Sequence, residues 1–273
     1  MRTLVHISDL HFGRIDNQTL APLREVIGDL RPDVVVVSGD LTQRARSAQF
    51  RQARHYLDTL PQPQIIVPGN HDIPLYNVAA RFFRPLVKYR RHITRDLAPE
   101  FIDDEIAVLG LNTARSLTFK DGRVNRQQVH HLQQRFGRLH PHLTRVVVTH
   151  HPFDLPPHFA RNELVDRAPM AMEVFARCGV DLLLAGHLHS SHSHNSAARY
   201  QISGYAALVV QAGTATSTRA RGEANSFNVL RVEHDEIQVQ LHRWTEGAGF
   251  ALAGTDVFHR EGDVWRPSHQ EPA

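Results

Sequence analysis

The chain repeats one pattern, in which a short run of apolar, mostly β-branched residues ends on a polar residue. The runs are "TLVHIS" before Asp9, "DVVVVSG" before Asp40, "QIIVPG" before Asn70, "EIAVLGL" before Asn112, "RVVVTH" at His150 and "VDLLLAG" before His187. Short apolar runs of this kind, several of them closed by Gly or Pro, are typical of buried strands. We therefore expect a strand at each of these positions.

Helical periodicity appears in three of the segments between these runs. Apolar residues recur every three or four positions in three sets: Leu20, Leu23, Ile27 and Leu30; Phe50, Ala53, Leu57 and Leu60; Val129, Leu132, Phe136 and Leu139. Such a stripe is typical of a helix that packs one face against a core. Alternating strands and helices predict a layered α/β fold, in which ligands bind at the carboxyl ends of the strands.

The pattern changes after His194. The stretches "YQISGYAALVVQAG", "SFNVLRVEHDEIQVQLHRW" and "ALAGTDVFHREGDVW" predict consecutive antiparallel strands, with "EHDE" as a hairpin turn. The sheets are therefore expected to be mixed. We expect a single domain over residues 1–265, followed by a frayed tail at 266–273.

Composition places the chain among ordinary globular proteins, with 41% hydrophobic and 22% charged residues and a formal net charge of +3. No apolar stretch approaches the roughly 18 residues of a membrane span, and "MRTLVHISDLHF" lacks the pattern of a secretory signal. Cys178 is the only cysteine, so an intramolecular disulfide is excluded, and we expect it to be a core hydrophobe. These features favour a cytoplasmic protein.

The polar residues at the strand ends form a candidate metal-binding set. In chain order they are Asp9-x-His11, Gly39-Asp40, Gly69-Asn70-His71-Asp72, His150 and Gly186-His187-x-His189. Side chains at i and i+2 of a strand point the same way, so Asp9 with His11, and His187 with His189, can each converge on one point.

The number of donor groups exceeds what one metal ion needs. Three oxygen donors (Asp9, Asp40, Asn70) and four imidazoles (His11, His150, His187, His189) are too many for one ion with four to six ligands, and they suffice for two ions that share a carboxylate. Mixed nitrogen and oxygen ligands favour Mn, Fe, Zn or Co over Mg or Ca. The sequence therefore predicts a centre of two divalent transition-metal ions.

The series "SDLH", "SGD", "PGNHD", "VTHHP" and "AGHLH" resembles the calcineurin-like metallophosphoesterase superfamily, and in detail the bacterial class III cyclic-nucleotide phosphodiesterases. The resemblance spans residues 9–189 and implies a four-layer α/β/β/α sandwich of two mixed sheets flanked by helices. It implies a phosphoric ester hydrolase in which a metal-bound hydroxide attacks phosphorus.

The same resemblance implies a role for each motif residue. It assigns Asp9, His11 and His189 to one metal, Asn70, His150 and His187 to the other, and Asp40 as the bridge between them. It selects His150 over the adjacent His151, which is expected to face elsewhere. His71 matches the histidine that contacts phosphate and protonates the leaving oxygen, with Asp72 as the residue that orients it.

Departures from sister families bear on the substrate. The stretch "GDLTQRA" keeps Arg44 but lacks the Asp and Gly of the GD-x-x-D-R-G motif of Ser/Thr protein phosphatases, and His71 stands where the pyrophosphatases of lipid A synthesis carry arginine. A histidine acid suits diesters, so we expect cyclic nucleotides or other small phosphodiesters as substrates. The alternatives are a phosphomonoesterase, a phospholipid or nucleotide-lipid hydrolase, and a non-catalytic scaffold on the same fold.

The segment "RFFRPLVKYRRHITR" (81–95) lies in a candidate cap at about 75–100. Its cations recur at helical spacing with apolar residues between them, and Pro85 is expected to break or start a helix. Two interpretations remain, a solvated basic face and a contact with an anionic membrane surface or another polyanion. Long nucleic acid is not expected as a partner, because no basic platform with interleaved aromatics occurs elsewhere. A homo-oligomer is compatible with this composition.

Four further polar residues have less defined expectations. His192 and His194 fall in a Ser-rich connection of "AGHLHSSHSHN", where we expect solvated side chains. Asn112 and Thr214 stand at strand ends, where a turn role is expected and substrate contact is the alternative.

Overall fold

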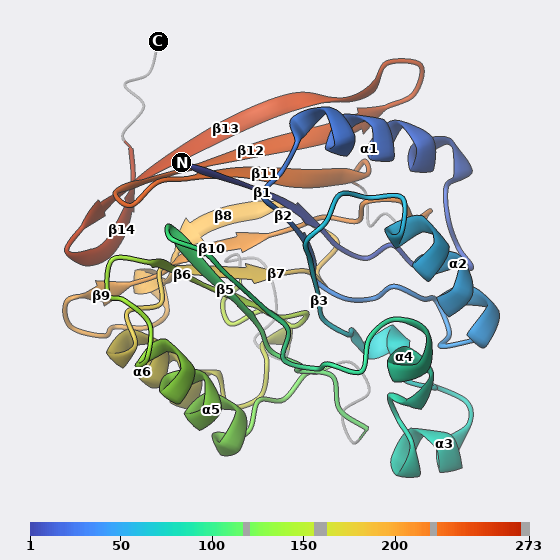
Figure 1. The fold of residues 1–273 in the computed structure, drawn as a ribbon, viewed down its shortest axis with the longest axis horizontal. Coiled ribbons are helices and arrows are strands. Elements are labelled where there is room, and N and C mark those ends of the chain that lie inside the picture. The colour runs from blue at the N-terminus through green and yellow to red at the C-terminus, as the bar shows by residue number, and fades with distance from the viewer. Residues whose placement is uncertain (117–120, 156–162, 219–222, 269–273) are drawn as a thin grey trace.

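The computed structural model describes residues 1–116, 121–155, 163–218 and 223–268 of the chain, and two mixed sheets form its centre (Figure 1). The eight-stranded sheet has the order β3 (Gln64–Ile66), β2 (Val34–Val37), β1 (Arg2–Ile7), β11 (Ser226–Val232), β12 (Glu236–Thr245), β13 (Gly249–Glu261), β14 (Asp263–Pro267), β9 (Tyr205–Ala206). The six-stranded sheet has the order β4 (Glu100–Ile102), β5 (Ile106–Gly110), β6 (Thr144–Val148), β7 (Leu182–Ala185), β10 (Leu208–Gln211), β8 (His192–Asn195).

Alternate residues of the central strands enter different cores. In β1, Leu4 belongs to the core between the two sheets, whereas Val5 and Ile7 belong to the core under the helices. The core between the sheets draws on both of them, with Val36 of β2 and Val146 of β6 among its members. Strands covered on both faces need continuous apolar runs, which is what the sequence shows.

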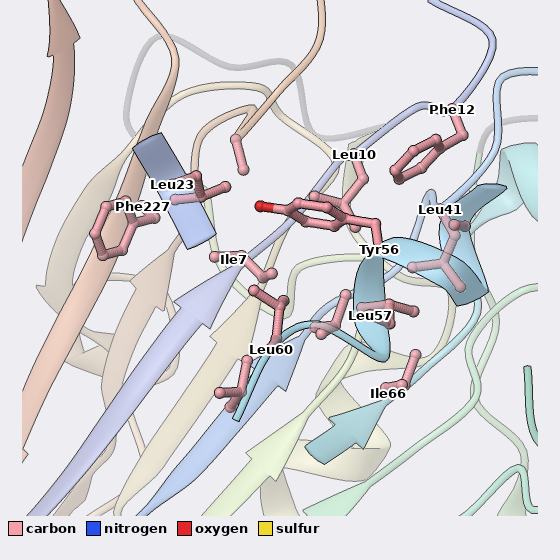
Figure 2. Packing of buried hydrophobic residues seen from close by; sticks show 14 of the residues in the cluster. Ile7, Leu10, Phe12, Leu23, Leu41, Tyr56, Leu57, Leu60, Ile66 and Phe227 are labelled. Atoms are coloured by element: carbon pink, nitrogen blue, oxygen red, sulfur yellow. The ribbon is translucent and has the colours of Figure 1, made fainter. Parts of the chain in front are cut away.

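Helices cover the outer face of each sheet. The helices α1 (Asn17–Leu30) and α2 (Ser47–Leu57) pack on the eight-stranded sheet, and α5 (Arg126–Phe136) and α6 (Ala168–Arg177) pack on the six-stranded sheet. Figure 2 shows the first of these cores, where Tyr56 and Leu57 of α2 lie close to Ile7 and Leu10. The chain therefore has the expected four-layer arrangement.

A candidate cap stands at one corner of the molecule in Figure 1. It contains two short helices, α3 (Val78–Phe83) and α4 (Val87–His92), with Pro85 between them as the sequence predicts. Helix α4 packs on α2.

Three expectations from the sequence need correction. Residues His192–Asn195 form strand β8, antiparallel to β10, instead of a connection. The strands after His194 are not all antiparallel as expected. Strand β10 pairs with β7 in parallel, and β9 pairs with β14 in parallel. Strand β14 continues to Pro267 and so includes the first two residues of the expected frayed tail, while 269–273 lie outside the described residues.

In the described residues, no helix is both long and apolar enough to cross a membrane.

Candidate metal centre

The seven predicted ligands lie in the loops that follow five strands. Asp9 and His11 follow β1, Asp40 follows β2, and Asn70 opens a short 3-10 helix (Asn70–Asp72) after β3. His150 follows β6, and His187 and His189 follow β7. Six of the seven residues are buried, and Asn70 is half-buried.

Five of these seven residues have a left-handed backbone. The φ angles are 54° at Asp9, 49° at His11, 52° at Asp40, 76° at His187 and 60° at His189. A side chain at positive φ costs on the order of 1–3 kcal/mol, and such strain gathers at functional sites where the surrounding structure imposes it. The loops therefore hold these side chains in conformations that an unconstrained chain avoids.

The two oxygens of Asp9 have different environments. Oδ2 accepts hydrogen bonds from the Ser8 hydroxyl (2.6 Å) and from the backbone N–H of His187 (3.0 Å). Oδ1 is buried without a hydrogen bond and lies 3.3 Å from Nε2 of both His11 and His189. One oxygen thus fixes the carboxylate, and the other faces two imidazoles.

The two carboxylate oxygens of Asp40 also have different environments. Oδ1 accepts a hydrogen bond from the backbone N–H of His71 at 2.8 Å. Oδ2 is buried without a hydrogen bond and lies 3.8 Å from His11 Nε2, 3.5 Å from His150 Nε2 and 4.0 Å from His71 Nε2. This oxygen is therefore placed between rings that come from different loops.

The tautomer of His150 follows from its contacts. Its Nδ1 donates to the carbonyl of Ser38 at 2.8 Å, so Nε2 is the ring nitrogen that carries the lone pair whenever the ring is neutral. That atom lies 3.0 Å from Oδ1 of Asn70. The adjacent His151 does not face elsewhere as expected, since its ring centroid lies 4.8 Å from that of His187. Its Nδ1 lies 2.8 Å from Thr113 Oγ1.

Potential ligand atoms gather in two main groups within the described residues, and Asp40 belongs to further groups that share members with both. One main group holds Asp9, His11 and His189, the other holds His150, His151 and His187, and in each group the ligand atoms lie within 4.8 Å of one another. Asp40 joins His11 and His71 in a third group and Asp9 and His150 in a fourth. His187 and His189 therefore enter different groups, which agrees with the assignment implied by the resemblance and not with the convergence that strand geometry allowed.

The donor chemistry fits a pair of divalent cations. The buried atoms without a hydrogen bond include Asp9 Oδ1, Asp40 Oδ2 and both ring nitrogens of His11. A buried polar atom without a partner costs about 1–3 kcal/mol, so such atoms are rarely left together unless something binds them. Mixed imidazole and carboxylate donors suit transition-metal ions.

The ionisation of the centre reflects its crowding. Burial alone would raise the pKa values of Asp9 and Asp40, but the neighbouring histidines outweigh it and hold both pKa values below the ordinary range. Burial would lower the pKa of His150, but Asp40 outweighs it and raises the pKa to about 9. The centre thus keeps two anionic carboxylates in a buried place.

Asp72 holds the loop that carries Asn70. Its carboxylate accepts hydrogen bonds from the backbone N–H groups of Gly69 (3.0 Å), Leu41 (3.2 Å) and Thr42 (2.9 Å), and from the Thr42 hydroxyl (3.0 Å). Burial, followed by the charge of Asp40, raises its pKa to about 6. These contacts join the loop after β3 to the loop after β2.

His71 lies at the edge of the centre and is partly exposed. Its Nδ1 donates to the carbonyl of Gln43 at 3.0 Å, so Nε2 is the ring atom that faces Asp40. The orienting contact at Nδ1 therefore comes from Gln43, and any effect of Asp72 on the ring acts through the loop backbone.

Sequence reasoning missed Glu163. Its Oε2 lies 3.3 Å from His187 Nε2, and the sequence around it has neither strand nor helix periodicity. A glutamate in "RNELVD" carries no local signal for this placement, because the contact joins residues 24 positions apart in the chain.

The less defined predictions have separate outcomes. Oδ1 of Asn112 accepts from the backbone N–H of Ala114 at 2.9 Å, which is the expected turn role. Thr214 is buried beside β11, where its carbonyl accepts from Ser226. His194 Nε2 lies 3.2 Å from Asp154, and its ring centroid lies 4.7 Å from that of His192. Cys178 is buried, and burial raises the pKa of its thiol.

Comparisons with known proteins agree with this architecture. The chain is 41% identical over 81 residues to the glycerophosphodiester phosphodiesterase GpdQ of Enterobacter lignolyticus, a match that covers 25% of this chain and 29% of that protein. It is 26% identical over 203 residues to a probable cyclic nucleotide phosphodiesterase of Synechococcus sp., covering 69% of this chain and 74% of that protein.

Solved structures share the fold. The purple acid phosphatase PPD1 of yellow lupin superposes with a TM-score of 0.73 at 12% identity, covering 100% of this chain and 57% of that one. A dimetal phosphatase of Danio rerio gives a TM-score of 0.62 at 15% identity, covering 92% of this chain and 98% of that one. The family model for calcineurin-like phosphoesterases matches residues 2–191, most of the chain. The chain therefore belongs to the calcineurin-like phosphoesterase family.

Proposed function

We propose that the protein is a phosphodiesterase that depends on two metal ions and hydrolyses cyclic nucleotides or other small phosphodiesters. The observation that carries the proposal is the position of Asp40 Oδ2, which has no hydrogen bond and faces both His11 and His150. A carboxylate oxygen so placed is what a bridging ligand requires. The names of the two curated relatives, both phosphodiesterases, support the choice of a diester.

The proposed cofactors are two divalent ions from Mn, Fe, Zn and Co. One ion would be held by Asp9, His11 and His189, and the other by Asn70, His150 and His187. Asp40 would be a ligand of both ions. Such ions supply Lewis acidity and lower the pKa of bound water toward neutrality. The single cysteine is compatible with the cytoplasm, where we place the reaction.

His71 is the proposed acid for the leaving group. Gln43 fixes the proton at Nδ1, so the exchangeable proton of the imidazolium is at Nε2, the atom on the side of Asp40. An alkoxide leaving group needs a proton, whereas an activated phenolate does not, so this role has most weight for natural diesters.

A substrate panel tests the proposal. Protein loaded with Mn²⁺ is assayed on bis(p-nitrophenyl) phosphate, p-nitrophenyl phosphate, cyclic nucleotides and glycerophosphodiesters, beside His71→Ala and the exposed-site control His55→Ala. We expect cleavage of diesters in preference to monoesters, and a loss in His71→Ala of about 10²–10⁴-fold on alkyl diesters but much less on the activated diester. His55→Ala is expected to match the unaltered chain.

The alternatives predict other results. A preference for p-nitrophenyl phosphate would favour a phosphomonoesterase, and a preference for lipid-linked esters would favour a phospholipid or nucleotide-lipid hydrolase. Fewer than about one bound ion per chain at saturation, with no hydrolysis, would favour a non-catalytic scaffold.

A further inference from the structure

The segment Tyr76–Arg95, here called the cap surface, gathers the exposed apolar side chains of the molecule. Seven large hydrophobic residues are exposed in the described part of the chain, and five of them lie here: Tyr76, Val78, Phe82, Phe83 and Val87. Phe83 is 85% exposed and Tyr76 is 76% exposed. Single exposed apolar residues are ordinary on protein surfaces, but a cluster of this size marks an interaction site.

The same surface is strongly cationic. Between Asp72 and Asp96 the chain has no acidic residue, and the exposed cations of the cap surface are Arg84, Lys88, Arg90, Arg91 and Arg95. Helix α2 adds Arg51 at its border. Burial, followed by the charges of Arg91, Arg51 and Lys88, lowers the pKa of His92, which indicates a positive potential at this place.

Buried contacts hold the cap surface in place. The Tyr89 hydroxyl donates to the carbonyl of Ile66 at 2.9 Å, and the rings of Tyr89 and His92 pack on Phe50 of α2. Arg81 is buried and donates to the carbonyls of Ser116 and Pro74. The phenylalanines are therefore exposed on an anchored structure.

We propose that the cap surface binds anionic lipid membranes. A bilayer with anionic headgroups offers charge for the arginines and an apolar interior for the phenylalanines and valines, which is the combination that interfacial helices use. The inference goes beyond the proposed reaction and does not depend on it.

Other occupants fit the cap surface less well. In a symmetric dimer the same patch meets itself, so a second copy would place these arginines against their own counterparts. A nucleic acid would use the cations and stack on aromatic rings, but it leaves Val78 and Val87 without a partner. A membrane uses all of these side chains.

Docking in this way would bring the metal centre close to the lipid headgroups. The cap surface begins at Tyr76, only four residues after Asp72 in the chain. The Arg44 guanidinium, in the loop that follows Asp40, lies 5.3 Å from the ring centroid of Tyr76. The cap surface therefore borders the loops that carry the proposed ligands of β2 and β3.

Vesicle binding tests the inference. Metal-loaded protein is sedimented with vesicles of phosphatidylcholine alone or of phosphatidylcholine with a quarter of phosphatidylglycerol. The variant F83S/R84Q removes one apolar and one cationic side chain from the cap surface. Its matched control, L252S/R243Q, removes the same two kinds of exposed side chain from the β12–β13 hairpin, which lies far from α3 in Figure 1.

We expect binding only to the anionic vesicles, weakened by salt, and reduced about tenfold or more in F83S/R84Q but not in the control. Both variants should keep the metal content and solution activity of the unaltered chain. Absence of binding at millimolar lipid, equal binding to neutral vesicles, or equal loss in both variants would overturn the inference. So would a dimer that F83S/R84Q dissociates, or tighter binding of a single-stranded oligonucleotide that this variant abolishes.

Discussion

The backbone N–H of His71 donates a 2.8 Å hydrogen bond to Oδ1 of Asp40. The other oxygen of the carboxylate accepts no hydrogen bond and lies 3.5 Å from His150 Nε2 and 3.8 Å from His11 Nε2. One atom of Asp40 therefore positions the loop of the proposed acid, and the other is available to bridge. In the proposed reaction, acid placement and metal binding would depend on the same side chain.

Replacing Asp40 by asparagine should separate these two roles. The amide oxygen can still accept from His71, but an NH₂ group in place of Oδ2 cannot bind a cation. We expect bound metal to fall from two ions per chain to one or fewer, and diester hydrolysis to fall more than about 100-fold. Elemental analysis and initial rates measure both. Asp58→Asn, on the surface, is the control, and full metal content in Asp40→Asn would contradict a bridging role.

Asp72→Asn should act through the loop backbone. The carboxylate accepts from four donors on Gly69, Leu41 and Thr42, and an amide replaces one of its oxygens by a donor group that faces donors. We expect a loss of about 1–3 kcal/mol in the free energy of unfolding and about 10- to 100-fold weaker metal binding. Urea denaturation and metal titration measure these changes. Selective loss on alkyl diesters with unchanged metal affinity would instead show a direct effect on His71.

Much of the fold could be predicted because its signals are local. The strands at the two sheet centres are covered on both faces, so β2 reads "VVVV" and β7 reads "LLLA". Strand β8 reads "HSHN", with every residue half-buried at the sheet edge, and it is a strand only because it pairs with β10. A polar edge strand leaves no apolar pattern in the sequence.

The sequence predicted which strand ends lie close together, but not all of the geometry that results. The expectation that His187 and His189 converge assumed an extended backbone, but both residues have positive φ and enter different groups. Asp9 and His11 do approach, with Oδ1 and Nε2 3.3 Å apart, although their backbones are also left-handed. Glu163 reaches His187 through tertiary folding of its loop, which no spacing rule describes.

A methyl group at Gly186 should disturb Asp9. A Cβ atom there would lie 1.9 Å from Ser8 Oγ and 2.7 Å from Asp9 Oδ2, two atoms that already share a hydrogen bond. We expect Gly186→Ala to lower the free energy of unfolding by about 1–3 kcal/mol and to weaken metal binding. Denaturation and metal titration are the measurements. Gly254→Ala is the matched control, since nothing lies within 4 Å of its Cβ position, and equal effects in both variants would rule out this contact.

His6 should make stability depend on pH. The ring is fully buried, with Nε2 2.9 Å from Ser38 Oγ, and burial lowers its pKa to about 3 although Asp9 opposes the change. In the unfolded chain the pKa is near 6.5. Between these values the unfolded chain binds a proton that the folded chain excludes, so stability falls as pH decreases below 6.5, by up to about 1.4 kcal/mol per pH unit.

The variant His6→Gln keeps a hydrogen-bonding side chain but does not titrate. Urea denaturation of both chains at equal metal content should show that the unaltered chain loses about 2 kcal/mol more than His6→Gln between pH 7 and pH 5. Asp9 and Asp40 titrate in both chains, so their contributions cancel in the difference. Parallel pH dependences would mean that His6 is protonated in the folded chain, and hence that the space between the two sheets admits a charge.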